Sequence, residues 1–262
     1  FSAGQRVSHG LLMSSVLGLT ATGLPLLYSQ AKWAKWVSHR LGGFAAMGAW
    51  HRFFALILMG VFVVHVVDGL KRIFVRREKG LLWGVSSIFP QPRDVRDLWK
   101  SLRWFVGLGE RPTFGRFTYW EKFDYLAVFW GMAIIGTSGI TLWFHDWFAH
   151  WMPGWWFNLA LLIHSEEALL ATTFIILIHF FNSHVRPDKF LMDLVIFTGR
   201  VSQEELATER AEEYADLLAK NALPAIETDA PPYWLKRLGW WMGGAAVLVG
   251  VVLLVLILIA VI

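Results

Sequence analysis

Four of the nine histidines lie well inside long apolar stretches of the sequence: His51, His65, His164 and His179. Ionisable side chains at membrane depth are costly and usually functional. The first two are fourteen residues apart and the last two are fifteen apart. On a helix, each pair therefore returns to nearly the same side after about four turns, roughly 21 Å along the axis. Two such pairs on two helices are suited to hold two haems, each between two imidazoles.

Other interpretations of these imidazoles exist. A proton relay or a transporter core would use the same side chains, and a single buried histidine is more often a hydrogen-bonded core residue than a ligand. Glycines near these helices, such as Gly48 and Gly139, would let a flat macrocycle approach, although packing between membrane helices favours glycine too. Cysteine is absent, which excludes disulfides, thiolate-held iron–sulfur clusters and covalently attached haem. Any haem is therefore haem b, and we expect two or three copies.

The composition indicates that lipid solvates much of the chain. Its 262 residues (29.9 kDa) are 56% apolar and 17% charged, with 16 Trp, 20 Phe and a mean hydropathy of +0.48. A soluble domain carries about a quarter charged residues. The sequence thus excludes a disordered or fibrous chain and argues against a soluble enzyme. Because the numbering begins at Phe1 rather than at Met, we expect further residues upstream.

Five stretches are apolar over about 20 residues, the length needed to cross a bilayer. They are too long and too evenly apolar for barrel strands, so they are predicted to be helices. We place them at Val7–Tyr28, Phe44–Leu70, Phe123–Phe144, Phe157–Phe181 and Leu238–Ile262. The predicted fold is all-α: a polytopic membrane protein with a four-helix haem-binding transmembrane bundle and a fifth transmembrane helix.

The distribution of Lys and Arg predicts the orientation, because cytoplasmic loops carry an excess of both. The 71–122 segment holds twelve, the 29–43 loop holds three and the 145–156 loop holds none. Together with the five spans, this distribution predicts a multi-pass protein with a defined orientation. Its amino terminus, its 71–122 loop and its 186–237 segment should lie in the cytoplasm.

Two stretches outside the spans are predicted to be surface helices. Asp94–Phe105 is amphipathic and is expected to lie at the membrane interface. Ser202–Asn221 is predicted to be one soluble helix, since Ser202 and Glu205 have capping-box spacing and Pro224 follows its end. The expected organisation is a four-helix domain over 1–199, a cytoplasmic helical segment over 200–236 and the fifth transmembrane helix over 237–262.

The histidine motifs resemble those of the dihaem cytochrome b subunits of membrane-bound formate dehydrogenases and nickel–iron hydrogenases. The resemblance covers roughly Gln5 to Arg186. Its motifs are Arg6-Val-Ser-His9 and Thr22-Gly23 in the first span, Gly48-Ala-Trp-His51 in the second, and Leu161-Leu-Ile-His164 with Leu177-Ile-His179 in the fourth. The longer phrase His179-Phe-Phe-Asn-Ser-His184-Val-Arg-Pro resembles the branch associated with multihaem c-type cytochromes.

The resemblance implies two bis-histidine haems. In the family pattern the outer haem takes the histidines matching His51 and His164, and the inner haem takes those matching His9 and His179. Spacing alone instead pairs His65 with His179, as in the cytochrome b of bc complexes. His65 and His9 are therefore alternative or additional haem ligands.

His184 follows His179 by five residues and is rotated from it by about 140° on a straight helix. We therefore do not expect it at the same haem edge. It is a candidate for the quinone site or for a third haem.

The resemblance also implies a location in the bacterial cytoplasmic (inner) membrane and electron transfer between a periplasmic redox subunit and the quinone pool. It places the quinone at the cytoplasmic side, where the Gly115–Lys122 stretch would border it. Glu121 and Lys122 are then candidates for proton exchange during quinone reduction, with an ordinary pair of interfacial charges as the alternative. The periplasmic partner would be a c-type cytochrome, an iron–sulfur protein, a hydrogenase or a dehydrogenase.

We expect the lipid bilayer and quinone as further partners, and no nucleic acid. The chain would be the electron-transfer subunit of an oxidoreductase complex. The alternatives are a bc-type or reductase-type cytochrome b with another donor, a haem-free transporter with a histidine proton relay, and a simple membrane anchor.

The predicted orientation can be tested by cysteine labelling, since the chain has no native cysteine. Single cysteines placed in the 71–122 and 202–232 segments should resist membrane-impermeant thiol reagents in intact cells, because both segments are expected in the cytoplasm. A cysteine in the 145–156 loop is the control and should react readily. Ready labelling of the first two sites would reverse the orientation.

Overall fold

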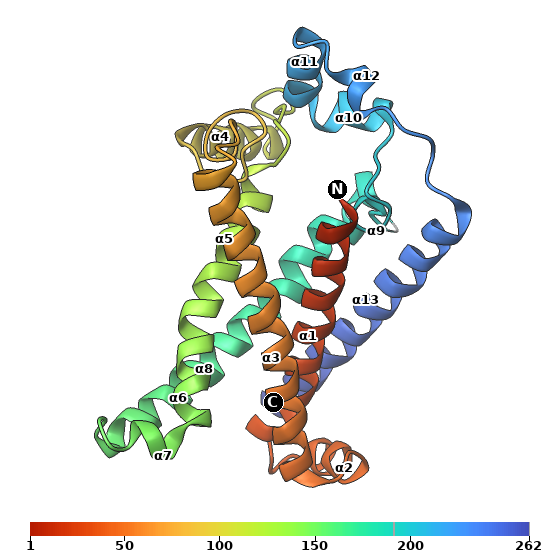
Figure 1. Ribbon diagram of the computed structural model, residues 1–262. Helices are drawn as coiled ribbons and strands as arrows, with labels where there is room; N and C mark the ends of the chain where they lie inside the picture. Colours follow the sequence, from red (N-terminus) through yellow and green to blue (C-terminus); the bar gives the residue numbers. More distant parts are fainter. Residues whose placement is uncertain (191, 262) are drawn as a thin grey trace. The chain divides into compact units, whose positions relative to one another are not determined.

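The computed structural model describes residues 1–190 and 192–261, and it contains no strand within these ranges (Figure 1). Five helices are long and apolar enough to cross a membrane, which confirms the prediction of a helical multi-pass membrane protein. They run over Ala3–Leu27, Gly43–Val75, Tyr119–Trp143, Gly154–Val185 and Tyr233–Ala260. The second and fourth extend past the predicted apolar runs because π-helical turns continue them to Val75 and Val185.

Most elements follow one another closely along the chain, except for the longer connections 76–91 and 106–118. The spans consist of α1 (Ala3–Leu27); α3 (Gly43–Leu70) with η1 (Lys71–Val75); α5 (Tyr119–Gly131) with η2 (Met132–Gly136) and α6 (Thr137–Trp143); α8 (Gly154–Phe174) with η3 (Ile175–His179) and η4 (Phe181–Val185); and α13 (Tyr233–Val261). The remaining helices are α2 (Lys32–Arg40), α4 (Pro92–Phe105), α7 (His145–Phe148), η5 (Pro187–Lys189), α9 (Val195–Thr198), α10 (Gln203–Glu209), α11 (Ala211–Ala219) and α12 (Leu223–Ile226). The elements η1 to η4 are π-helical and η5 is a 3₁₀ turn.

The chain divides into two compact units. The first comprises residues 1–65, 130–199 and 232–262, and the second comprises 66–129 and 200–231. Helices α3 and α5 each run from one unit into the other. The histidines of the spans lie in the first unit, whereas most of the charged side chains discussed below lie in the second.

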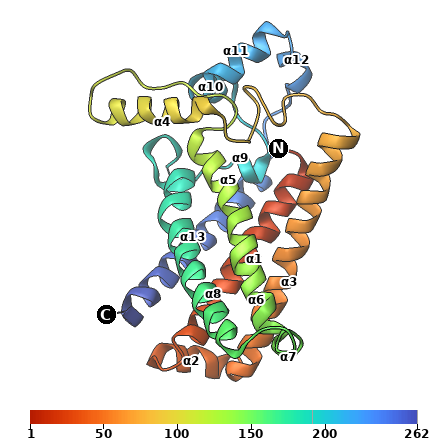
Figure 2. The same ribbon diagram turned by 90° about the vertical axis from the view of Figure 1, so that its left-hand side faces the viewer.

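A small apolar core in the first unit joins α1, α8 with η3, and α13. Its buried residues are Leu24, Ile176, Leu253 and Ile257. Thr20 of α1 and Thr172 of α8 share a hydrogen bond of 3.2 Å. Helix α13 packs against α1 and runs obliquely along it (Figures 1 and 2). The fifth span is thus part of the core packing of the first unit.

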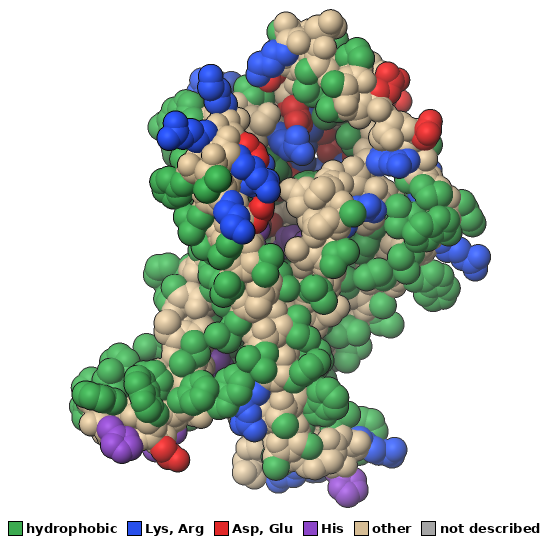
Figure 3. Space-filling model, viewed as in Figure 1, with side chains coloured by type: hydrophobic (Ala, Val, Ile, Leu, Met, Phe, Trp, Pro, Cys, Tyr) green, Lys and Arg blue, Asp and Glu red, His purple; other side chains and the backbone are tan. Residues whose placement is uncertain are grey.

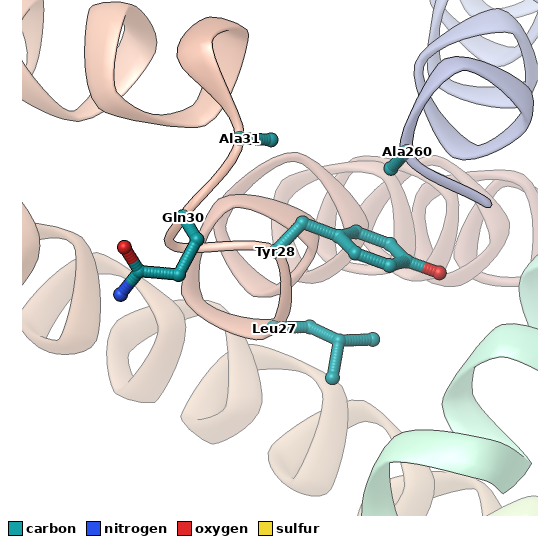
Figure 4. Close-up of a pocket in the computed structure, with 5 residues that line it drawn as sticks. All are labelled: Leu27, Tyr28, Gln30, Ala31 and Ala260. Carbon is teal, nitrogen blue, oxygen red and sulfur yellow. The ribbon is translucent and has the colours of Figure 1, made fainter. Parts of the chain in front are cut away.

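A shallow hollow of about 330 Å³ lies at the ends of α1 and α13 (Figure 4). Its lining residues are Leu27, Tyr28, Gln30, Ala31 and Ala260. Figure 4 shows the amide of Gln30 pointing away from Ala260. Because the hollow is lined by no carboxylate, imidazole or cationic side chain, we assign no chemistry to it.

Ion pairs hold the second unit together. Nζ of Lys122, whose side chain is 1% exposed, lies 2.8 and 3.1 Å from the two carboxylate oxygens of Asp94. Lys122 stands in the first turns of α5 and Asp94 in the first turn of α4. This pair therefore fixes the beginning of α4 to the beginning of a membrane span.

A second ion pair joins α5 to the segment that follows residue 200. The guanidinium of Arg210 donates hydrogen bonds of 2.6 and 2.9 Å to the carboxylate of Glu121. The backbone N–H and hydroxyl of Thr118 donate to the same carboxylate. Burial raises the pKa of the neighbouring Glu213 carboxyl above its usual range, although Arg116 and Arg210 oppose the shift.

The prediction of one helix over Ser202–Asn221 is wrong, because the helix breaks at Arg210. Helix α10 ends and α11 begins there, with φ −125° and ψ 44° at Arg210. The beginning is as predicted: Ser202 caps α10 and accepts a hydrogen bond of 3.1 Å from the N–H of Glu205. The break coincides with the tertiary ion pair to Glu121, which helical periodicity cannot reveal. The predicted helix over Asp94–Phe105 is confirmed as α4.

Replacing Arg210 should loosen the second unit. In Arg210→Ala the carboxylate of Glu121, about one-third exposed, loses its cationic donor, which we expect to cost about 1–2 kcal/mol of local stability. Cleavage of the 200–231 segment by subtilisin should then accelerate about tenfold, since each 1.4 kcal/mol is a factor of ten. Lys220→Ala, which breaks an exposed pair with Asp216, is the control and should change the rate little. Equal rates in both variants would contradict a stabilising role for Arg210.

Candidate functional site

His51 of α3 and His164 of α8 lie next to each other in the first unit. Their ring centroids are 6.2 Å apart and the ring planes are inclined by 75°. Two imidazoles whose nitrogens each lie about 2 Å from a shared metal ion have centroids about 6 Å apart. The separation therefore fits one metal ion between the two rings.

The tautomer of His164 follows from its hydrogen bond. Its Nδ1 lies 3.0 Å from the backbone oxygen of Ile135 in η2. A carbonyl oxygen can only accept, so Nδ1 carries the proton and Nε2 keeps its lone pair. Ser138 Oγ lies 3.3 Å from the same Nδ1 and donates its own proton to the carbonyl of Ile134 at 2.7 Å.

The tautomer of His51 follows in the same way. Its Nδ1 lies 3.0 Å from the hydroxyl oxygen of Thr22 on α1. That hydroxyl donates to the carbonyl of Gly18 at 2.7 Å, so its oxygen accepts a proton from His51. The backbone of Leu19 also interacts with the His51 ring. His51 therefore carries its proton on Nδ1 and keeps the lone pair on Nε2.

Both imidazoles are thus in the form that binds a metal. A metal-ligating histidine typically donates its second ring N–H to a carbonyl or another acceptor, which orients the ring and raises the basicity of the ligating nitrogen. Ile135 and Thr22 supply these acceptors from α5–α6 and α1. Two helices besides those that carry the histidines therefore take part in the site.

Two glycines leave room for the rings. A Cβ added at Gly139 would lie 2.9 Å from Cε1 of His164, and one added at Gly23 would lie 3.1 Å from Cε1 of His51. A Cβ at the first distance forces its neighbour to move. The close approach of α6 to His164 therefore requires glycine at position 139.

A second group of imidazoles lies elsewhere in the first unit. His9 of α1 is close enough to interact electrostatically with both His179 and His184, and these two also interact with each other. His184 is 9% exposed, and its Nδ1 is buried without a hydrogen-bond partner among the described residues. The ring of Phe180 lies 6.3 Å from that of His179 and 6.0 Å from that of His184.

The expectation that His184 does not share a haem edge with His179 stays a prediction. It assumed a straight α-helix, but the chain is π-helical over Ile175–His179 and again over Phe181–Val185. In a π-helix the hydrogen bonds join residues five apart, so such residues lie roughly one turn apart. His179 and His184 are close enough to interact electrostatically with each other and with His9.

The other predicted site residues lie in different surroundings. His65 is exposed on α3. Glu121 and Lys122 belong to the second unit, where each is engaged in an ion pair, with Arg210 and with Asp94. Arg6, beside the His9 motif, donates a hydrogen bond of 2.9 Å to the carbonyl of Phe197. Sequence reasoning missed the hydrogen-bonding roles of Thr22, Ile135 and Ser138. Ile135 acts through its backbone carbonyl, which leaves no mark in the residue type, and the hydroxyls of Thr22 and Ser138 meet histidines distant in the sequence.

Within the described ranges, no three His, Cys, Asp or Glu side chains converge so as to hold a bare metal ion. Comparison with protein families, curated proteins and solved structures finds no match to this chain.

Gly139→Ala should weaken the ligand site at His164, because the added methyl group displaces that ring from the acceptor at Ile135. Loss of such orienting contacts costs about tenfold or more in metal affinity. We expect Gly139→Ala to retain less haem per chain than the parent, measured as the pyridine haemochrome. Gly131→Ala is the matched control, since its nearest neighbour would be Cδ1 of Ile135 at 3.8 Å. If both variants retained the same amount of haem, Gly139 would not contribute to the site.

Proposed function

We propose that this chain is a b-type cytochrome subunit of a membrane oxidoreductase complex, which carries electrons between a periplasmic redox partner and the quinone pool through two bis-histidine haems. The observation that carries the proposal is the pair His51 and His164. Each ring has its proton on Nδ1 and a lone pair on Nε2, and their centroids are 6.2 Å apart. A metal ion between the rings would accept both lone pairs.

The residues of the chain position the cofactor and control its surroundings. When bound, haem supplies reversible one-electron chemistry. Thr22 and Ile135 hold the rings of His51 and His164 in the ligating tautomer. Both histidines lie inside spans, where lipid-facing helices exclude water and keep the site at low dielectric.

The second site uses His9 and the far end of the fourth span. The proximity of His9 to His179 supports their pairing, as in the formate dehydrogenase pattern, while His65 stays a rival ligand. His164 and His179 lie about 20 Å apart along one helix, so the two haems would stand at successive depths of the bilayer. The buried Nδ1 of His184 then faces the quinone or serves a third haem.

The quinone would be reduced or oxidised at the cytoplasmic side, given the distribution of Lys and Arg. Glu121 and Lys122 stay predictions for this site. Their ion pairs with Arg210 and Asp94 would have to open before either exchanged a proton with quinone. The sequence contains no cysteine or nucleotide-binding motif, so the electrons would pass through a separate periplasmic subunit.

The proposal is tested by the visible spectrum and haem content of the purified chain. We expect sharp reduced α-bands typical of haem b and two haems per chain. His51→Ala or His164→Ala should each remove about one haem and leave the other. A colourless preparation from haem-replete cells would refute the cytochrome and favour a proton relay.

The same measurement identifies the ligands of the second haem. His179→Ala and His9→Ala should each remove this haem, whereas His65→Ala should keep it if His9 is the partner of His179. Loss of a further haem in His184→Ala would indicate three haems. His39→Ala, at an exposed position on α2, is the control and should keep full haem content. Full content in every variant would refute both sites.

A further inference from the structure

Helix α4 has three distinct faces. At about 100° per residue, Val95, Leu98, Leu102 and Phe105 share one face. Arg96, Lys100 and Arg103 share a second, and Asp94, Asp97 and Ser101 share the third.

The face that packs on the protein is polar. Asp97 and Ser101 are 5% and 2% exposed, and Ser101 donates a hydrogen bond of 2.8 Å to the carbonyl of Asp97. The apolar face points outward instead, with Val95 72% and Phe105 68% exposed. This is the reverse of a helix on a water-soluble domain, which turns its apolar face to the core.

Helix α4 is also held where a membrane span begins. Asp94 is bound to Lys122 in the first turns of α5. Within the second unit, α4 runs crosswise to α5 (Figure 2). If α5 crosses the bilayer, α4 therefore lies near the plane of its surface.

The cationic face borders the apolar one. Arg96, Lys100 and Arg103 are all exposed, and Arg103 also donates a hydrogen bond of 3.0 Å to the carbonyl of Leu108. Asp97, the nearest carboxylate to Arg96, lies 3.7 Å from it and is buried. Lys and Arg side chains gather with apolar ones over α4 (Figure 3). The net charge of the exposed part of the helix is positive.

We propose that α4 is an in-plane membrane helix that binds anionic phospholipid. Its apolar face enters the boundary between headgroups and acyl chains, and its three cations bind the phosphate-bearing headgroups alongside. An apolar face beside a row of Lys and Arg is the arrangement that binds anionic bilayer surfaces. The inference is independent of haem binding, since it uses only residues of the second unit.

The test measures the depth of α4 with a single nitroxide on the cysteine-free chain. The label is placed at Leu102→Cys, and the protein is reconstituted as one copy per nanodisc. The discs contain phosphatidylcholine alone or phosphatidylcholine with phosphatidylglycerol. In the anionic discs we expect the label to collide with oxygen rather than with a water-soluble nickel complex, as a label inserted in lipid does. Each Lys or Arg near an anionic surface contributes about 1 kcal/mol, so Arg96→Gln/Lys100→Gln/Arg103→Gln should lower the ratio of inserted to released helix about a hundredfold.

Two controls accompany this measurement. A label at Glu204→Cys, exposed on α10, should stay accessible to nickel in both discs. Lys220→Gln, which removes an exposed cation remote from α4 in the sequence, should leave the insertion of Leu102→Cys unchanged. The thermal unfolding midpoint of each variant shows whether it has folded.

Three results would overturn the proposal. If the label at Leu102→Cys collided with the nickel complex in anionic discs, the apolar face would lie outside the bilayer and would be expected to bind a protein partner. Equal protection in both kinds of disc would mean insertion without selection of anionic lipid. Protection that appears only in discs with two copies, together with dipolar broadening between labels, would mean that a second copy of the chain covers the face.

Discussion

A polar group on a lipid-solvated helix must find its partner within the chain, because the bilayer core offers none. The arrangement of the first unit follows from this constraint at His51 and His164. Each ring has one nitrogen satisfied by a neighbouring helix, through Thr22 or Ile135. These hydrogen bonds thereby connect the four spans that contribute the residues. The other nitrogen of each ring then keeps its lone pair.

The second unit meets the same constraint with charges. Lys122 stands in the first turns of a span, almost fully buried, and its charge is balanced by Asp94 of α4. Glu121 beside it, about one-third exposed, is paired with Arg210, the residue between the end of α10 and the start of α11. Through these two ion pairs, α5 is attached to α4 and to the 200–231 segment. The attachment leaves the apolar face of α4 exposed at the beginning of a span.

The fourth span shows how local backbone geometry changes what a set of residues can do. An α-helix would point His179 and His184 in different directions. Two π-helical segments alter the rotation per residue, and His9 of α1 then interacts with both. Such π-helical segments are frequent at functional sites. The interaction of His9 with both His179 and His184 gives these two histidines a neighbour from another span, which two evenly spaced pairs would not provide.

The sequence by itself determined the helical class, the five spans and the histidines worth examining. These depend on composition and on one-dimensional periodicity, which are present in the chain before it folds. Only the tertiary structure decided that His164 donates to Ile135, that His184 interacts with His9, and that Arg210, at a break between two helices, pairs with Glu121. Each of these depends on a partner distant in sequence, on a backbone carbonyl or on a local change of helical pitch. None of the three is encoded by the type or spacing of the residues alone.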